Sequence, residues 1–371
     1  AYEIASCLVG SEMCIRDRSS MSYIAKPKFH HPNLPRNGLG LTRRDYEGAM
    51  STLCAGCGHD SVSAAIVEAC YELDLPAHKL AKMSGIGCSS KTPTYFLSKS
   101  HGFNSVHGRM PSVATGANLA NNELKYIGVS GDGDTASIGF GQFAHAVRRQ
   151  VDMLYIVENN GTYGLTKGQF SATNDRVSLG RKGQKNAFDS IDLAAMAIQL
   201  GASFVGRGFS GDKEQLVPMI KAALSHKGFA FIDVISPCVT FNNHNGSTKS
   251  FEFFRDNERS ITATDYIAPR EAITAEYEEG SVIDVTLHDS SRVRLRKLDA
   301  NYDPSDSAAA LQHIMKHEEL GEVATGLLYL NVEDTELKEK MDMINVPLNS
   351  LGAKELRPSS DILESINKSL R

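Results

Sequence analysis

The chain has 371 residues, of which 41% are hydrophobic and 22% charged, a composition typical of globular proteins. Its 39 basic and 44 acidic residues give a net charge of −5, so the chain lacks the cationic field that binds nucleic acid or an anionic membrane surface. No apolar run approaches the roughly 18 residues that a membrane span needs. We therefore expect a soluble, cytoplasmic protein whose partners are small molecules and other proteins.

The first 50 residues carry little periodic pattern. Residues 1–20 lack the basic start, apolar core and cleavage site of a secretory signal, and they precede a candidate initiator, Met21. We predict that 1–20 is a non-native or disordered tail. Residues 21–50 contain prolines and polar side chains without a hydrophobic repeat, which predicts an N-terminal arm that packs on a partner.

The following segments alternate between helix and strand patterns. From Asp60, apolar side chains recur at helical spacing, which predicts a helix with Asp60 as its N-cap and Cys70 on its buried face. Residues 125–130 form a short apolar strand pattern that leads directly into Gly-Asp-Gly-Asp, and a helical pattern around Phe143 follows. The apolar residues 153–157 predict the next strand.

The alternation continues with a predicted helix over 191–200 and a predicted strand over 229–235. Strands that alternate with helices predict an α/β fold, a mostly parallel sheet with helices on both faces, with the ligand at the carboxyl ends of the strands. After about Phe254 the pattern changes to polar hairpin strands and a Lys/Glu-rich tail. We therefore predict a ligand-binding domain over 51–250 and a C-terminal extension over 251–371.

A Gly-Asp-Gly motif and an Asn pair each follow one of the predicted strands. Asp132 comes directly after the first strand, and Asn160 follows the next, so the two side chains are expected at neighbouring strand ends. Carboxylate and amide oxygens suit Mg²⁺, which usually shares its ligands with a bound phosphate group. Glycine lets the backbone approach such a group closely. Gly-Asp-Gly alone is also common in turns, so the specific feature is the combination.

Cysteines form a second constellation. The seven cysteines lie at positions 7, 14, 54, 57, 70, 88 and 238, and Cys54 and Cys57 form a C-x-x-C pair, which in a reducing compartment indicates metal binding or redox chemistry. With Cys88 and Cys238 the chain offers four thiolates. The spacing permits either an iron-sulfur cluster or a structural zinc ion, and unconnected buried cysteines are a third reading.

The order of the motifs resembles a known family. In sequence they are CAGCGH, GIGC, HGR, GDGD and NNGTYGLTKGQ, at 54–59, 85–88, 107–109, 131–134 and 159–169. This order resembles the thiamine-diphosphate-binding beta subunit of 2-oxoacid:ferredoxin oxidoreductases over roughly residues 50–245. The phrase PCVTFNNH and the long extension are most similar to the 2-oxoglutarate branch. The resemblance implies the conversion of 2-oxoglutarate, coenzyme A and oxidised ferredoxin to succinyl-CoA, carbon dioxide and reduced ferredoxin.

The resemblance also implies a thiamine-diphosphate-binding fold and a set of site residues. A [4Fe-4S] cluster would be held by Cys54, Cys57, Cys88 and Cys238, and Mg²⁺ by Asp132, Asn160 and the carbonyl of Thr162. The cofactor would be lined by Ile86, Gly87, Cys88, Ser89, Gly133, Asp134, Gly164 and Leu165. Catalytic roles would fall to Lys91 at the substrate, Lys167 at the coenzyme A phosphates, and His107 and Arg109 near the cofactor. The alternative for these four side chains is a solvated loop charge.

In this family the glutamate that activates thiamine diphosphate belongs to a partner, and we find no motif for it here. The resemblance therefore implies an obligate alpha subunit, in an alpha-beta heterodimer or its dimer, with ferredoxin as a further partner. Three alternatives remain open at this point: a family member that takes pyruvate or another 2-oxo acid, a cluster-free thiamine-diphosphate decarboxylase or synthase, and a non-enzymatic zinc-binding module.

Overall fold

The computed structural model describes residues 33–176, 178–180, 183–268, 282–297, 302–357 and 359–370. The chain divides into two units, Ala1–Pro35 and Arg36–Arg371, and the helices and strands of the described residues all belong to the second. The predicted tail 1–20 and most of the predicted arm lie outside the described residues. The described part of the arm contains one 3-10 turn, η1 (Arg43–Tyr46).

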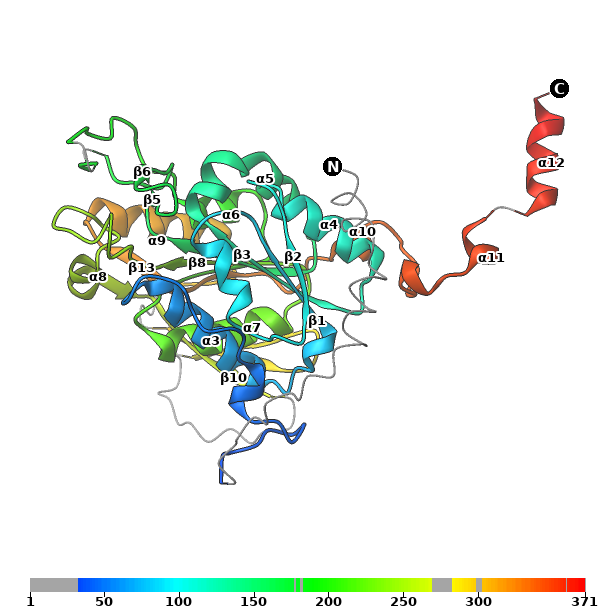
Figure 1. The fold of residues 1–371 in the computed structure, drawn as a ribbon, viewed down its shortest axis with the longest axis horizontal. Coiled ribbons are helices and arrows are strands. Elements are labelled where there is room, and N and C mark those ends of the chain that lie inside the picture. Colours follow the sequence, from blue (N-terminus) through cyan, green and yellow to red (C-terminus); the bar gives the residue numbers. More distant parts are fainter. Residues whose placement is uncertain are drawn as a thin grey trace, which may run out of the picture. The chain divides into compact units, whose positions relative to one another are not determined.

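An eight-stranded sheet forms the centre of the second unit (Figure 1). Its order is β2 (His101–Asn104), β1 (Leu80–Ser84), β3 (Lys125–Gly131), β4 (Met153–Asn159), β8 (Phe229–Ile235), β7 (Phe204–Phe209), β13 (Val323–Leu330) and β9 (Glu258–Ser260). All neighbouring strands are parallel except β13 and β7, which are antiparallel. The predicted mostly parallel sheet is thus confirmed, and the strands predicted at 125–130, 153–157 and 229–235 are β3, β4 and β8.

The central strands are apolar on both faces because a hydrophobic core lies on each side of the sheet. On β4, Leu154 and Ile156 belong to one core, and the alternate residues Met153, Tyr155 and Val157 belong to the other. This period of two, with every residue of β4 buried, explains why the strand is a continuous apolar run in the sequence.

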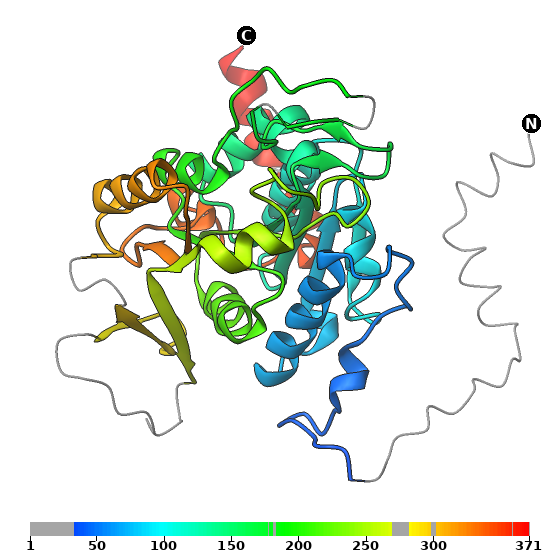
Figure 2. The same cartoon turned by 90° about the vertical axis from the view of Figure 1, so that its left-hand side faces the viewer.

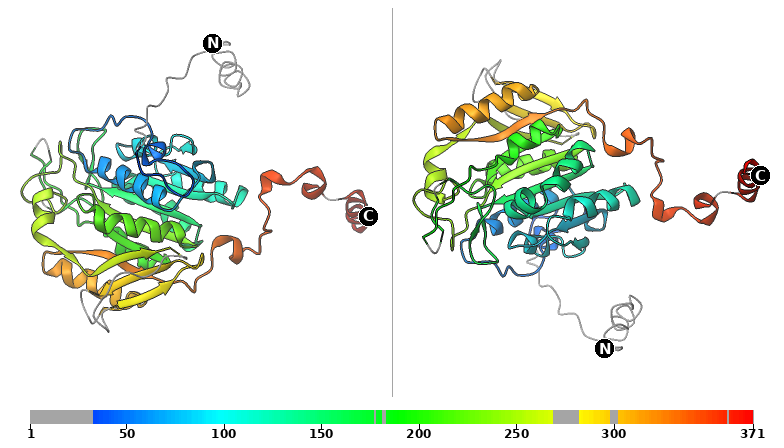
Figure 3. Two further views of the ribbon diagram at one scale, coloured as in Figure 1. Left: turned by 90° about the horizontal axis from the view of Figure 1, so that it is seen from below. Right: turned by 90° about the horizontal axis from the view of Figure 1, so that it is seen from above.

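Helices cover both faces of the sheet (Figure 3). One core includes α3 (Gly58–Glu72) and α7 (Lys213–Ser225). The other includes α4 (Met110–Ala120), α5 (Phe140–Arg148), α6 (Leu193–Gln199) and α9 (Ser307–Glu319). Cys70 is fully buried on α3 as predicted. The predicted N-cap was wrong, because α3 begins earlier: Cys57 is the cap, and Asp60 lies in the first turn.

Short turns and a two-stranded ribbon complete this region. The turns are η2 (Ala77–Lys79), η3 (Ser89–Thr94) and η4 (Gly133–Ile138), a π-helical turn, and the ribbon pairs β5 (Thr162–Tyr163) with β6 (Gln169–Phe170).

The C-terminal part of the chain forms a second, three-stranded antiparallel sheet of β10 (Thr262–Ile267), β12 (Arg292–Lys297) and β11 (Val282–Thr286) (Figure 2). The predicted polar hairpin corresponds to β11 and β12. The same part of the chain supplies β9 and β13 to the main sheet, and α8 (Phe251–Asn257), α10 (Leu337–Lys340), η5 (Leu348–Ser350), α11 (Ala353–Leu356) and α12 (Ser360–Ser369). The predicted boundary at residue 250 remains a prediction. Within the described ranges, no helix combines the length and apolar character that a membrane span requires.

Candidate functional site

The two predicted ligand-bearing loops meet at the carboxyl end of the sheet. Asp132 follows β3 and Asn160 follows β4, and the two strands are direct neighbours. The backbone N–H of Asn160 lies 3.4 Å from Oδ1 of Asp132, and the N–H of Thr162 donates to Oδ1 of Asn160 at 3.0 Å. Parallel pairing therefore brings the three predicted magnesium ligands together, as expected from their positions after adjacent strands.

Two hydroxyl groups fix the buried carboxylate of Asp132. Ser171 and Thr173 both donate to Oδ2, the latter at 2.7 Å, while the residue itself is 1% exposed. Burial raises the pKa of Asp132, and these two hydrogen bonds oppose that shift. With Oδ2 held by the hydroxyls, Oδ1 is the oxygen on the side of Asn160. This set of carboxylate, amide and carbonyl oxygens fits a hard cation such as Mg²⁺.

Asp134 organises the loops that surround this point. Its Oδ1 accepts from Nδ1 of His107 at 2.7 Å and from the N–H of Gly108 at 2.9 Å, and its Oδ2 accepts from Ser130 at 3.0 Å. A Cβ at Gly85 would collide with the same carboxylate, so this position needs glycine. Asp134 therefore ties three segments of the chain together.

A cavity of about 70 Å³ lies between these loops. Its lining includes His107, the three predicted magnesium ligands, and all eight of the predicted cofactor-lining residues: Ile86, Gly87, Cys88, Ser89, Gly133, Asp134, Gly164 and Leu165. Gly133 allows a close approach here, because a Cβ would lie 2.5 Å from the Tyr163 ring. Tyr163 in turn donates to the carbonyl of Gly133 at 3.0 Å.

The four cysteines of the second constellation line one cavity of about 210 Å³. Cys54, Cys57, Cys88 and Cys238 surround it together with Lys91. A Cβ on Gly164 would lie 3.3 Å from the sulfur of Cys88 and 3.7 Å from that of Cys238, so this glycine packs directly against two of the thiols. Among the described residues, no three His, Cys, Asp or Glu side chains converge closely enough to hold a single metal ion.

Local structure positions these thiols. Cys57 is the N-cap of α3, where the helix dipole favours a thiolate, and its N–H donates to the carbonyl of Cys54 at 3.0 Å. Burial raises the pKa of Cys57 to about 12. It also raises the pKa of Cys88, which the charge of Lys91 opposes. A strongly bound cationic group would be needed to hold such buried sulfurs as thiolates.

The two cavities are neighbours. His59, Cys88, Asn160, Gly164 and Leu165 line both of them. The side-chain amide of Asn242, four residues after the last cysteine, donates to the carbonyl of Asn160 at 2.8 Å. The cysteine loops and the Asp132 loop thus form one continuous site.

Sequence reasoning missed two buried side chains between the cavities. Glu158 is fully buried, and both its oxygens accept from the hydroxyl of Thr92, at 3.0 and 2.9 Å. Burial raises its pKa well above the usual range. His59 is also buried, its Nδ1 lies 2.6 Å from Oγ of Ser236, and burial lowers its pKa to about 4. The available signal was a charged residue, Glu158, at the end of an otherwise apolar strand.

Two of the four predicted catalytic residues line a cavity of the site, and two do not. Lys91 lines the cysteine cavity and His107 the other cavity. Lys167 and Arg109 are exposed and lie outside the linings of both cavities. Lys167 has a φ of +80°, in the left-handed region. The catalytic roles of these four residues remain predictions.

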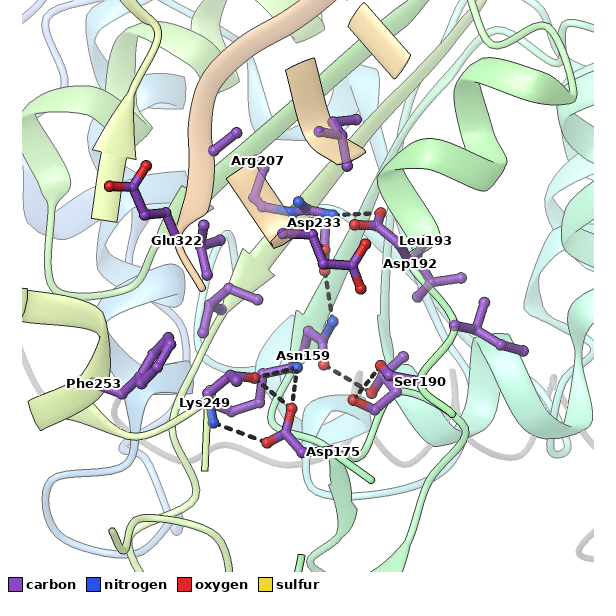
Figure 4. Close-up of a pocket in the computed structure, with 18 of the residues that line it drawn as sticks. Asn159, Asp175, Ser190, Asp192, Leu193, Arg207, Asp233, Lys249, Phe253 and Glu322 are labelled. Carbon is purple, nitrogen blue, oxygen red and sulfur yellow. Dashed lines mark hydrogen bonds and ion pairs between the residues drawn. The ribbon is translucent and has the colours of Figure 1, made fainter. Parts of the chain in front are cut away.

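Hydrogen bonds extend from Asp132 to the polar residues of a third cavity, of about 160 Å³. Figure 4 shows that cavity in close-up. Thr173 lies 3.0 Å from Oδ1 of Asn159, whose amide donates to Asp233 at 3.0 Å. Arg207 then donates from Nε to Asp233 at 3.1 Å and from Nη2 to Asp192 at 2.5 Å. Hydrogen bonds therefore connect the loop of the predicted magnesium ligand to a buried arginine between two carboxylates.

A known family and a solved structure match the part of the chain that contains this site. The family described as thiamine pyrophosphate enzyme, C-terminal TPP binding domain, matches residues 85–234, which include Cys88, Asp132 and Asn160. The chain is 28% identical to a solved 2-oxoglutarate:ferredoxin oxidoreductase from Magnetococcus marinus with 2-oxoglutarate, coenzyme A and succinyl-CoA bound. That match has a TM-score of 0.66 and covers 86% of this chain and 97% of the other.

Curated relatives carry related names. A 2-oxoacid:ferredoxin oxidoreductase subunit beta from Sulfolobus sp is 43% identical over 193 residues, 52% of this chain and 63% of the relative. The 2-oxoglutarate synthase subunit KorB from Methanocaldococcus jannaschii is 37% identical over 212 residues, 55% and 77% of the two chains. The 2-oxoglutarate oxidoreductase subunit KorB from Mycobacterium tuberculosis is 37% identical, over 57% and 58%. The chain thus spans less than two thirds of the first and third of these relatives.

Proposed function

Because the chain belongs to the family of 2-oxoacid:ferredoxin oxidoreductase beta subunits, we propose that it is the cofactor-bearing subunit of an enzyme that oxidatively decarboxylates 2-oxoglutarate onto coenzyme A and reduces ferredoxin. The substrate choice is supported by the two KorB relatives and by the ligands named for the Magnetococcus structure. Pyruvate or another 2-oxo acid is the second candidate, since the name of the Sulfolobus relative specifies only a 2-oxoacid.

One observation carries the proposal: the cavity with the oxygen ligands and the cavity with the four cysteines share a wall. Bound thiamine diphosphate would supply the electron sink for decarboxylation. Asp132, Asn160 and the carbonyl of Thr162 would hold the Mg²⁺ of its diphosphate. Ser171 and Thr173 fix the carboxylate of Asp132 before the ion arrives, which lowers the reorganisation needed for binding.

The cysteine cavity supports a [4Fe-4S] cluster over zinc. A structural zinc ion needs four ligands that meet at one point, with sulfurs about 2.3 Å away. The four cysteines instead line a cavity of about 210 Å³, which has room for a group larger than a single ion. A cluster, which spreads its four irons over four thiolates, suits this arrangement better. Its position beside the cofactor cavity would give electrons a short exit route.

The remaining parts of the proposal concern partners and location. Lys91 would pair with the substrate carboxylate, and His107, held by Asp134, would face the cofactor. Lys167 and Arg109 are exposed, which suits contact with coenzyme A phosphates or with the alpha subunit. A cytoplasmic location fits the five described cysteines, all free thiols.

The test is anaerobic co-expression with the neighbouring alpha chain, followed by assay of iron, sulfide, zinc and thiamine diphosphate and by a substrate panel. We expect about four irons and four sulfides per chain, and viologen reduction that requires 2-oxoglutarate, coenzyme A and both subunits. Cys238→Ser should lose iron but keep thiamine diphosphate, and Asp132→Asn should do the reverse.

Each alternative has its own outcome in this experiment. One zinc per chain without iron or thiamine diphosphate would indicate the zinc-binding module, and thiamine diphosphate without iron a cluster-free enzyme. A preference for pyruvate would change only the substrate. Full turnover by the chain without its partner would contradict the proposed subunit division.

A further inference from the structure

A buried lysine lies next to the edge strand β2 of the main sheet and outside the linings of the two cavities of the proposed active site. Lys82 is on β1 and is 8% exposed. Its Nζ donates to the carbonyls of Phe96 and Leu97, at 2.6 and 3.0 Å, and lies 5.3 Å from the centre of the Phe96 ring. These contacts use two of its three N–H groups and contain no negative charge. Among the ion pairs of the described residues, none involves Lys82.

A buried ammonium group without a counter-ion is costly, because removal from water disfavours the charged form. Burial accordingly lowers the pKa of Lys82 to about 8. Backbone carbonyls can orient the group but cannot neutralise it. A Met at this position would fill the same space without the desolvation cost, so packing alone does not account for a charged side chain here.

The lysine lines a cavity of about 370 Å³, one side of which is formed by paired residues of β1 and β2. Lys82 pairs with Gly102 of β2, and Ser84 pairs with Asn104, so alternation along both strands puts these four positions on one face. The lysine stem passes over Gly102, where a Cβ would lie in ordinary van der Waals contact with its Cε, at 3.6 Å. The opposite wall comes from η3 and the residues around it: Ala49, Ser90, Pro93, Thr94 and Ser98.

The lining of this cavity is rich in donors, and none of the described residues that form it is an acid. Besides Lys82, its polar side chains are Ser84, Ser90, Thr94, Ser98 and Asn104. Ser90 donates to the carbonyl of Gly87, whereas the side chains of the other four make no hydrogen bond within the described part of the chain. A single cation among hydroxyl and amide donors, with no carboxylate on the wall, is the composition expected of an oxyanion site.

We propose that the cavity bounded by Lys82, Ser84, Ser98 and Asn104 binds a phosphate-type oxyanion. The third N–H of Lys82 and the free donors face the bound anion, whose charge compensates the buried ammonium. The size of the cavity allows the anion to be inorganic or to be the phosphate end of a larger molecule, and the two sources share this chemistry. The site is separate from the predicted cofactor and cluster ligands, so it does not depend on the proposed function.

The test measures the melting temperature of the purified complex with added phosphate, against sodium chloride at matched ionic strength. Linkage predicts that phosphate at about ten times its dissociation constant raises the melting temperature by about 2–4 °C. Lys82→Met should remove this increment and should not destabilise the anion-free protein. Lys79→Met, at an exposed lysine that pairs with Glu123, is the matched control and should keep the increment.

Isothermal titration with phosphate and with a phosphomonoester separates the two sources. Tighter binding of the ester identifies the phosphate end of a larger ligand, and equal affinity identifies a free anion; both support the site. Lys82→Arg should retain binding. No phosphate-specific increment in the wild type, or an equal increment in Lys82→Met, would overturn the proposal.

Discussion

Removal of the buried charge of Arg207 should weaken both the fold and the predicted magnesium site. Arg207 is 6% exposed, and its guanidinium lies between Asp233 and Asp192 (Figure 4). Arg207→Met keeps most of the side-chain volume but leaves two carboxylates uncompensated. Loss of one partner of a buried ion pair costs about 3–5 kcal/mol. Because a domain is stable by about 5–15 kcal/mol, the variant should fold with a clearly lower free energy of unfolding.

The pH dependence separates this electrostatic effect from lost packing. Burial already raises the pKa of Asp233, and Arg207 opposes that shift. Without the arginine, the folded-state pKa of Asp233 rises further above its unfolded value. Its contribution is then unfavourable at neutral pH, where the group is charged, and it fades as pH falls and the carboxyl gains a proton. Urea unfolding should therefore show a deficit in Arg207→Met that is largest near pH 7.5 and smaller near about pH 5.

A double variant provides the control. The double variant Arg207→Met, Asp233→Asn has no charge at position 233, and the amide oxygen of the new asparagine can still accept from Asn159. The free energy of unfolding of the double variant should therefore be at least about 1 kcal/mol higher than that of Arg207→Met. The Mg²⁺ concentration for half-maximal thiamine diphosphate binding should rise in the single variant and partly return in the double one. A double variant no more stable than the single, or a deficit independent of pH, would refute the reasoning.

Three further changes test other parts of the site. Thr173→Val removes a hydroxyl that donates to Asp132, so the Mg²⁺ requirement for thiamine diphosphate binding should rise about tenfold, whereas Thr173→Ser should stay near wild type; equal effects would contradict the role of the hydroxyl. Gly133→Ala puts a Cβ 2.5 Å from a tyrosine ring and should lower cofactor retention after desalting, unlike Gly141→Ala, where nothing lies within 4 Å. Burial lowers the pKa of His226 in the folded chain to about 3, from 6.5 in the unfolded chain. Between these two pH values the unfolded chain therefore binds a proton at His226 that the folded chain does not bind. As the pH falls from 6.5 towards 3, the free energy of unfolding should therefore decrease by about 1.4 kcal/mol per pH unit. Urea unfolding of His226→Gln should not show this decrease.

Local pattern explains which parts of the fold could be predicted. β3, β4 and β8 are buried on both faces, so their sequences are short apolar runs between turn residues, and their alternation with helices indicates a parallel sheet. The start of α3 was less predictable. Asp60 is a good capping residue, but the C-x-x-C turn starts the helix at Gly58, and tertiary context decided the cap.

The candidate site likewise contains residues whose proximity could be predicted from the sequence and residues whose proximity could not. Asp132 and Asn160 follow adjacent strands, so their proximity follows from topology. The partners Arg207, Asp233 and Asp192 come from three separate elements, and nothing local in the sequence indicates that their charges meet. Lys82 is a similar case, since a lysine in a strand normally suggests an exposed face, and nothing local in the sequence indicates that its Nζ is buried against the carbonyls of Phe96 and Leu97.

The position of β13 has a consequence for synthesis of the chain. β7 pairs with β8 on one side and with β13 on the other, and β13 is more than a hundred residues further along the chain. While the protein is being translated, the open edge of β7 must wait for residues 323–330 to leave the ribosome. An unpaired edge is a template for association with other chains, so a nascent or truncated chain that stops before β13 would be prone to aggregate even with every predicted cofactor ligand already made.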